Sequence, residues 1–347
     1  MASVKPITII GGGLAGLTLG IGLRQRDVPV TVIEAGKYPR HRVCGEFISG
    51  RGQEILIRLG YNVLNSARGA VSARTVSFHS TNKSTPPRRI LSPAVCISRF
   101  ELDAALAGEF LRLGGELRCD LRWSGADESE GVVRATGRIP STNADGELWF
   151  GLKIHAQNVP LAADLEMHFS SRGYVGICRI NHGEFNVCGL FRKLPGETGV
   201  GRDRLDLLRG FAGSLLRRRL SEAEFDESSF CAVAGLSLKP WRALQRPEIC
   251  VGDAITMIPP VTGNGMSMAF ESAELALNPL TSWSREEMSW EEARRNIASA
   301  CDVAFSRRLI AAQWLQKLVL TPSLQNTLVT LSACNDWLWR MAFRQTR

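Results

Sequence analysis

The chain has 347 residues, 44% of them hydrophobic, which is enough for one large domain or two modest ones with a buried core. No apolar run is long enough to cross a bilayer and the first residues show no signal-peptide pattern, so we expect a cytoplasmic protein. The nine cysteines form no Cys-x-x-Cys pair and the net charge of +8 accompanies no nucleic-acid-reading motif, so we expect no disulfide framework, no metal site and no nucleic-acid partner.

The first part of the chain predicts a strand–helix–strand unit. A β-branched run precedes a group of glycines, and an apolar helical pattern and a second β-branched run that ends at Glu34 follow it, which is typical of a βαβ unit. In chain order we predict a strand at 7–10, a helix at 14–23, a strand at 30–33, a loop at 82–89, a helix at 99–113 and a strand at 132–135.

The rest of the chain changes from short strands to helices. Short β-type runs separated by Gly and His-Gly turns predict an antiparallel meander with strands at 149–156, 164–169, 174–180 and 185–191. A helix at 202–220, a strand at 249–252 and a helix at 266–277 follow. From Trp290 the sequence is helical and basic, with a break at Pro322.

Residues 11–16, Gly-Gly-Gly-Leu-Ala-Gly, fit the dinucleotide-binding pattern G-x-G-x-x-G. Gly11 allows the tight turn, Gly13 lets backbone N–H groups approach a pyrophosphate, and Gly16 allows close helix–strand packing. Glu34 follows about 20 residues later, where a carboxylate accepts hydrogen bonds from adenosine ribose hydroxyls. The segment therefore predicts a dinucleotide site, although it does not distinguish FAD from NAD.

A second loop, residues 252–266, also suits a flavin. Asp253 stands at the end of a predicted strand and can accept hydrogen bonds from ribitol hydroxyls. Gly263-Asn264-Gly265 opens the helix that begins near Met266, so its N–H groups and the helix dipole can stabilise negative charge on a reduced flavin.

Several segments resemble one superfamily of flavoproteins. Residues 250–254 and 259–266 look like the second FAD signature of single-Rossmann flavoproteins, the para-hydroxybenzoate-hydroxylase-type monooxygenases and the geranylgeranyl reductases. Residues 40–46, Arg-His-Arg-Val-Cys-Gly-Glu, resemble the geranylgeranyl reductase branch, and residues 97–103 resemble the helix-opening arginine motif of both groups. The resemblance implies FAD as cofactor.

The resemblance implies an α/β fold: a Rossmann-type FAD-binding domain with an inserted, mainly antiparallel β substrate domain and a C-terminal helical region. We expect the FAD-binding domain to begin at 1–80, to continue with a loop through 81–147 and to close at 233–282, with the substrate domain at 148–232 and the C-terminal helices at 283–347. The implied cofactor-binding residues are Gly11, Gly13, Leu14, Ala15, Gly16, Glu34, Ala35, Arg42, Cys44, Gly45, Arg99, Gly252, Asp253, Pro260, Gly263, Asn264, Gly265 and Met266.

Three residues are candidates for the chemistry. Cys44, which the resemblance places near the flavin, could donate a proton or simply pack. His155 shares one strand face with Trp149 and Lys153, a face that points to solvent or into a cleft, and could act as an acid or base. Tyr174 could hydrogen-bond a substrate hydroxyl. Glu46 is more simply a cap or an ion-pair partner.

Departures from each subfamily leave the reaction open. Thr136 stands where the monooxygenases usually carry Asp, and Ile255-Thr256 stands where they often carry His. Residues 173–178 lack the aromatic-Pro strand of geranylgeranyl reductases, and the Trp-x-Trp-x-Ile-Pro signature of halogenases is absent. One fingerprint is present, and the glycines at 196–201 have the wrong spacing for another, so NAD(P)H would visit the flavin transiently or a separate reductant would supply the electrons.

We therefore expect an FAD-dependent oxidoreductase, a monooxygenase that hydroxylates a hydrophobic aromatic or polyketide-like small molecule, in preference to a geranylgeranyl-reductase-like enzyme that reduces an alkene in a lipidic substrate. A flavin-binding sensor or scaffold is a third reading. The aromatic and basic stretch 337–344 either packs on the FAD domain or contacts a membrane surface peripherally. The oligomeric state is left open.

Overall fold

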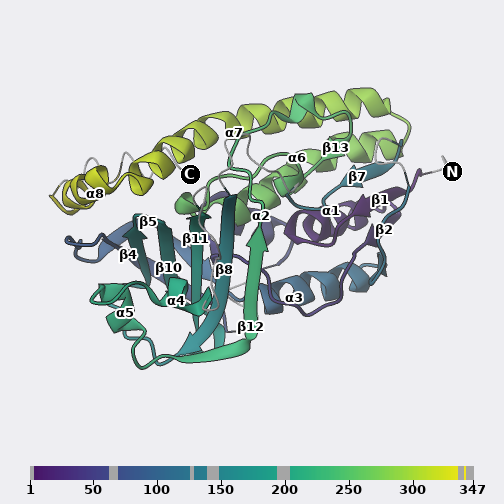
Figure 1. Ribbon diagram of the computed structural model, residues 1–347. Helices are drawn as coiled ribbons and strands as arrows, with labels where there is room; N and C mark the ends of the chain where they lie inside the picture. Colours follow the sequence, from purple (N-terminus) through teal and green to yellow (C-terminus); the bar gives the residue numbers. More distant parts are fainter. Residues whose placement is uncertain are drawn as a thin grey trace.

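The computed structural model describes residues 4–61, 69–125, 129–138, 148–193, 204–334 and 340. Its first layer is a five-stranded parallel sheet, to which segments between residues 7 and 250 contribute (Figure 1). The strand order is β13–β7–β1–β2–β6, made of β1 (Ile7–Ile10), β2 (Val30–Ile33), β6 (Glu116–Arg118), β7 (Val132–Arg134) and β13 (Ile249–Cys250). The predicted strands at 7–10 and 30–33 are confirmed residue for residue, and they pair in parallel register as a βαβ unit requires.

Helices cover this sheet. They are α1 (Leu14–Arg24), α2 (Arg51–Arg58), α3 (Arg99–Arg112) and α6 (Gly265–Ser284), and α1 packs against both α3 and α6. Apolar or small residues occupy almost every position of α1, so the helix is buried on all sides except at its last turn. The helices predicted at 14–23 and 99–113 are confirmed, and α6 extends seven residues beyond the predicted end at Leu277, through Pro279.

The second layer is an eight-stranded sheet with the order β12–β8–β11–β10–β9–β4–β5–β3. Its strands are β3 (Phe47–Ile48), β4 (Val71–His79), β5 (Arg88–Cys96), β8 (Leu148–Gln157), β9 (Leu165–Ser170), β10 (Gly173–Arg179), β11 (Phe185–Lys193) and β12 (Glu224–Ala234). All neighbours are antiparallel except β4 and β9, which run parallel. The four predicted strands exist, but β8 lies beside β11 rather than beside β9, so the simple meander covers β9–β10–β11 only.

Strands β3, β4, β5 and β12 are additions that the sequence did not predict. Part of the predicted loop at 82–89 is strand, since β5 begins at Arg88. Strand β4 was not predicted because its buried positions include Ser77 and His79, so its sequence does not alternate regularly between apolar and polar residues. Both β4 and β5 join the eight-stranded sheet although they precede residue 147. The predicted domain boundaries stay a prediction.

The outer face of the eight-stranded sheet forms a core of its own. Phe150, Leu152 and Ile154 of β8 pack there with Leu208 of α4 (Arg204–Arg209) and Leu216 of α5 (Leu215–Arg219). The predicted helix at 202–220 is thus two short helices. The opposite face of the sheet points toward the helices that follow α6.

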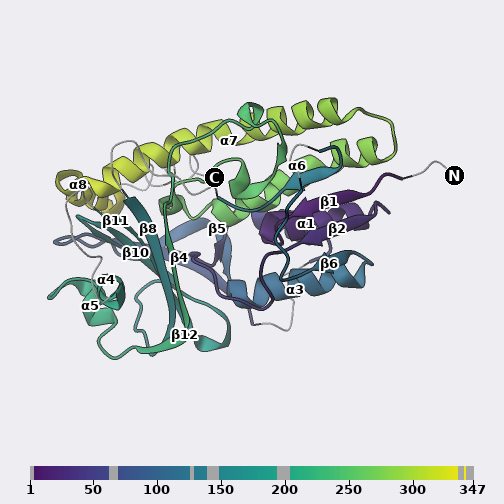
Figure 2. The same cartoon turned by 45° about the vertical axis from the view of Figure 1, so that its right-hand side comes forward.

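Two C-terminal helices join the layers. Helix α7 (Trp290–Leu320) runs along both sheets and contacts β13 at one end and β9 toward the other (Figures 1 and 2). Ser289 and Glu292 form a reciprocal capping box at its start, and α8 (Pro322–Cys334) follows the predicted break at Pro322. Among the described helices, none combines the length and the apolar character needed to cross a membrane.

Candidate active site

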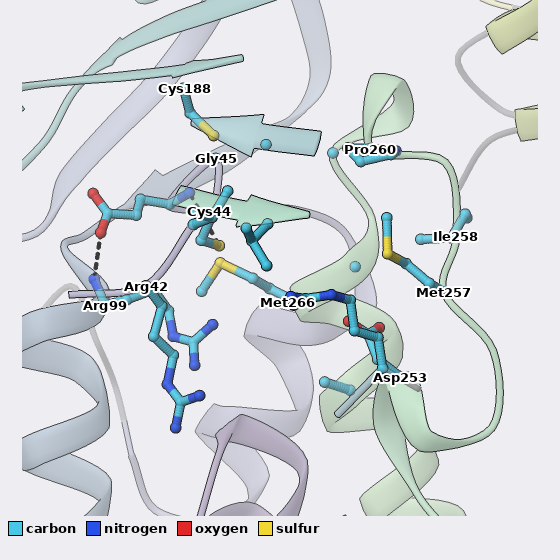
Figure 3. Close-up of a pocket in the computed structure, with 18 of the residues that line it drawn as sticks. Arg42, Cys44, Gly45, Arg99, Cys188, Asp253, Met257, Ile258, Pro260 and Met266 are labelled. Carbon is cyan, nitrogen blue, oxygen red and sulfur yellow. Dashed lines mark hydrogen bonds between the residues drawn. The ribbon is translucent and has the colours of Figure 1, made fainter. Parts of the chain in front are cut away.

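A cavity of about 1010 Å³ lies between the two sheets, at the carboxyl ends of the parallel strands. That volume is at the upper end of the range of about 300–1,000 Å³ for ligand pockets. Figure 3 shows Arg42, Cys44 and Arg99 on one side, Asp253, Met257 and Pro260 on the other, and Met266 between them. All the predicted cofactor-binding residues line this cavity except Gly16 and Asn264.

The dinucleotide loop forms one end of the cavity. Gly11 has φ +105°, and a Cβ there would collide with the carbonyl oxygen of Ala135 on the neighbouring strand, so only glycine fits. Gly16 is equally restricted, because a Cβ would collide with the carbonyl oxygen of Gly11; it packs against the loop and does not line the cavity. The first N–H groups of α1 have no acceptor within the helix, and Leu14 and Ala15 line the cavity.

Glu34 lies at the same end and is only 4% exposed. Its carboxylate accepts hydrogen bonds from the backbone N–H groups of Gly12 and Gly36, each at 2.9 Å. Arg40 and Arg42 pair with it at 2.5 and 3.4 Å. These contacts hold the carboxylate at the position predicted to receive ribose hydroxyls.

The segment after β2 carries Cys44 and Gly45 along the cavity wall. The Cys44 thiol accepts a hydrogen bond from the N–H of Glu46 at 3.4 Å. Burial raises the pKa of Cys44, and the positive charge of Arg99 opposes this. Arg99 itself makes a two-pronged ion pair with Asp103 at 2.6 and 2.8 Å. Burial acts to lower the pKa of Arg99, but the charge and hydrogen bond of Asp103 outweigh it and raise that pKa. Cys44 is therefore a neutral thiol near pH 7.

The second loop forms the facing wall. It consists of two short 3₁₀ turns, η3 (Gly252–Ala254) and η4 (Pro260–Thr262), which lead into α6. Within the described residues, no hydrogen bond is made to the Asp253 carboxylate. Burial raises the pKa of Asp253 to about 6, and Arg99 and Arg138 act against this rise. The Asp253 carboxylate therefore lies in the cavity wall as a hydrogen-bond acceptor for a ligand.

The three candidates for chemistry are placed differently. Cys44 and Tyr174 both line the cavity. The Tyr174 hydroxyl donates to Oε1 of Gln316 in α7 at 3.2 Å, and burial holds its pKa well above the usual value. His155 is not a cavity residue and does not face solvent, since it is 2% exposed. It contacts two residues that line the cavity, Glu46 and His41, but does not line it itself, so a direct acid–base role for His155 is not supported by its position.

Glu46 is the centre of a buried ionic cluster that forms part of the cavity wall. Its side chain is fully buried and accepts hydrogen bonds from the N–H of Arg99 and from Nε2 of His155, both at 2.8 Å. Lys153, also fully buried, pairs with it at 3.5 Å and donates to Nδ1 of His41 at 3.1 Å. Burial, Lys153 and His155 together lower the pKa of His41 to about 4. Glu46 is thus the ion-pair partner that the sequence suggested, and it also lines the cavity.

The other end of the cavity is an apolar chamber under the eight-stranded sheet. Its walls are the inward-facing residues of β4, β9, β10 and β11 and residues of α7 and α8, among them Val76, Phe78, Met167, Phe169, Leu190, Val319 and Val329. The alternation of β4 and β9 gives these apolar positions to the chamber and their polar neighbours to the outer face. The sequence did not identify this chamber, because its residues come from six separate elements.

The sequence also missed Thr136, Gly137 and Arg138 as cavity residues, although it noted that Thr136 departs from a family pattern. Burial lowers the pKa of Arg138, and the negative charge of Asp253 opposes this. A signal was available: the segment directly follows β7, and ligands of open parallel sheets bind beyond the carboxyl ends of the strands. The stretch 337–344, which was considered for membrane contact, lies outside the described residues apart from Arg340.

Comparisons with known proteins agree with this geometry. Residues 9–72 match the family model of an NAD(P)-binding Rossmann-like domain. The conditioned medium factor receptor 1 of Dictyostelium discoideum is 24% identical over 345 residues, which cover 84% of this chain and 66% of that protein. This chain therefore spans a little under two thirds of that relative's length.

Solved structures are similar over nearly the whole chain. The flavin-dependent brominase Bmp2 is 17% identical with a TM-score of 0.78, and the match covers 99% of this chain and 93% of the brominase. PqsL of Pseudomonas aeruginosa, solved with 2-aminobenzoylacetate, is 16% identical with a TM-score of 0.71, and the match covers 94% of this chain and 99% of PqsL. A geranylgeranyl bacteriochlorophyll reductase-like protein of Thermoplasma acidophilum is 16% identical with a TM-score of 0.72, and the match covers 95% of this chain and 91% of that protein. The chain therefore has the Rossmann-type fold of flavin-dependent monooxygenases and geranylgeranyl-reductase-like proteins, as the resemblance predicted, and it shares this fold with a flavin-dependent brominase.

Proposed function

We propose that this protein is an FAD-dependent oxidoreductase and that it hydroxylates a hydrophobic aromatic or polyketide-like small molecule. The observation that carries the proposal is the single cavity of about 1010 Å³, which joins a dinucleotide loop at one end to an apolar chamber at the other. A bound dinucleotide would not occupy the apolar chamber. A flavin enzyme needs such a space, because its substrate binds beside the cofactor.

The residues of the cavity fit FAD. The N–H groups at the start of α1 would hold the pyrophosphate, and Glu34 would hold the adenosine ribose. Asp253 would accept hydrogen bonds from the ribitol, and the N-terminus of α6 at Gly265 would stabilise negative charge on the flavin ring. When bound, FAD would supply the redox chemistry, and the hydroxylation would consume NAD(P)H and O₂, with one oxygen atom entering the product and the other leaving as water.

The chain's own residues would then orient the substrate and exclude water. The chamber offers apolar walls from Val76, Phe169 and Leu190, with the Tyr174 hydroxyl and the Cys44 thiol as polar groups in reach of the cavity. PqsL of Pseudomonas aeruginosa, described as a probable FAD-dependent monooxygenase, supports the hydroxylase proposal by similarity of fold.

Alkene reduction in a lipidic substrate is the second candidate. The neutral, buried thiol of Cys44 favours it, because such a reduction needs a proton as well as a hydride and Cys44 lies in the cavity wall. The similarity to a geranylgeranyl bacteriochlorophyll reductase-like fold points the same way.

Two measurements test the proposal. Protein purified without added flavin should release FAD, not FMN, on denaturation; protein that neither contains nor binds FAD would refute the cofactor assignment. The reduced protein is then incubated with a cell extract as the source of substrate, with and without labelled O₂. Untargeted analysis of the products separates the two reactions. Label in the product supports hydroxylation, and an equal yield of unlabelled product without O₂ supports alkene reduction. A flavin-loaded protein that forms no product from any extract would support a sensor or scaffold.

A further inference from the structure

A cluster of two histidines and a glutamate lies on the outer face of the eight-stranded sheet, away from the FAD cavity. The parallel register of β4 and β9 sets His79 beside His168 and Ser77 beside Glu166. Because side chains alternate along a strand, these four residues point away from the face that carries Val76, Phe78 and Met167. His79, Glu166 and His168 are each at most 5% exposed.

The potential ligand atoms of the cluster converge on one oxygen. Nε2 of His168 lies 3.1 Å from Oε2 of Glu166, and Nε2 of His79 lies 3.7 Å from the same atom. The three ligand atoms all lie within 4.8 Å of one another. In a tetrahedral zinc site with bonds of about 2.0–2.1 Å, neighbouring ligand atoms are separated by about 3.4 Å. Small movements of the two rings would therefore place all three atoms around one ion.

The rings are held by neighbours in a way that suits ligation. Nδ1 of His79 lies 2.9 Å from the Ser84 hydroxyl and Nε2 lies 2.9 Å from that of Ser77. When Nδ1–H donates to Ser84, the lone pair of Nε2 accepts from the Ser77 hydroxyl, and an ion bound at Nε2 would replace that one hydrogen bond while Ser84 still orients the ring.

Arg219 of α5 is the cation that holds Glu166 in the absence of an ion. Its Nε and terminal nitrogen lie 3.1 and 3.0 Å from the two carboxylate oxygens, and its side chain is 21% exposed. A bound ion would share Glu166 with Arg219 or displace it toward solvent. Either way Arg219 competes with the ion rather than supporting it.

A second cavity, of about 530 Å³, adjoins the cluster and is lined by both histidines together with Thr81, Ser170, Asp206 and Arg217. It gives an ion a route in and leaves room for a water ligand. Zinc sites with an open coordination position have three protein ligands and a water molecule as the fourth ligand.

We propose that His79, Glu166 and His168 bind one divalent transition-metal ion of the zinc class, with an open coordination position toward the second cavity. The site would tie β4 to β9 on the side opposite the FAD cavity. The sequence analysis did not predict this site. Its ligands are histidines and a glutamate from two strands that are distant in the sequence and were not predicted to pair.

The test is metal binding by untagged full-length protein that has been stripped with a chelator. Wild-type protein should take up one equivalent of Zn²⁺ by elemental analysis, and Co²⁺ should give visible absorption bands of a low-coordinate site. H168A and E166Q should each weaken the binding by more than about tenfold, since the loss of even an outer partner costs that much. H182A is the matched control, because His182 is exposed, lies outside the cluster and should not matter.

R219Q separates the metal site from the ion pair, which E166Q also breaks. It should bind Co²⁺ at least as tightly as the wild type, because a competing cation is gone. The circular dichroism spectrum reports whether each variant is folded. No stoichiometric uptake by the wild type, equal uptake by H168A and E166Q, or a loss in R219Q as large as that in E166Q would overturn the proposal.

Discussion

Replacing Asp253 by asparagine should stabilise the flavin-free protein and weaken its binding of FAD. The pKa of Asp253 is raised from 3.8 to about 6, chiefly by burial. At 1.36 kcal/mol per pKa unit, ionising this carboxyl in the folded protein costs at most about 3 kcal/mol. Since the folded pKa lies above the unfolded one, the stability contributed by the neutral carboxyl is full below pH 3.8 and is lost as the pH rises through about 6.

D253N removes that cost, so the flavin-free variant should need more denaturant to unfold at pH 7 than the wild type. FAD binding should respond in the opposite way. If ribitol hydroxyls donate to the ionised carboxylate, the wild type must lose a proton to bind below pH 6. Its FAD affinity should then be about tenfold weaker at pH 5 than at pH 7, and the variant should lose this pH dependence.

The assay is a titration of flavin-free protein with FAD, followed by flavin fluorescence at pH 5, 6 and 7. Chemical denaturation of the same samples gives the stability. Asp253 would have no part in the flavin site if D253N bound FAD as tightly as the wild type and with an unchanged pH profile. A variant that was less stable and also bound FAD less well would instead indicate a purely structural role.

Three further substitutions test other parts of the site. E34Q should weaken FAD binding by about tenfold or more, since hydrogen bonds to charged groups contribute about 1.5–3 kcal/mol, with an unchanged circular dichroism spectrum; undiminished FAD content would contradict this. E46Q should destabilise the protein by about 3–5 kcal/mol because it strands buried Lys153, and the double variant E46Q/K153M should recover most of the loss in denaturant titrations. M167W should fill the apolar chamber, leaving FAD content intact while abolishing product formation; full activity would place the substrate elsewhere.

Local features of the sequence were enough for the dinucleotide half of the molecule. The turn at Gly11 needs a positive φ and the packing at Gly16 admits no side chain, so both constraints act within a few residues and are visible as a motif. The same holds for the strands at 7–10 and 30–33 and for the helix break at Pro322, since periodicity and proline geometry are properties of short segments.

Partnerships between distant segments were decided only by the tertiary structure. Nothing in the alternation of β8 reveals that His155 turns inward to Glu46, 109 residues earlier in the chain, and so lies behind the cavity wall instead of in it. In the same way Tyr174 meets Gln316 only because α7 crosses the eight-stranded sheet. Strand order determines which side chains meet, and it depends on the summed packing of the whole chain. A single sequence therefore reveals which residues are suited to chemistry, while the packing of the two sheets and α7 decides which of them share a cavity.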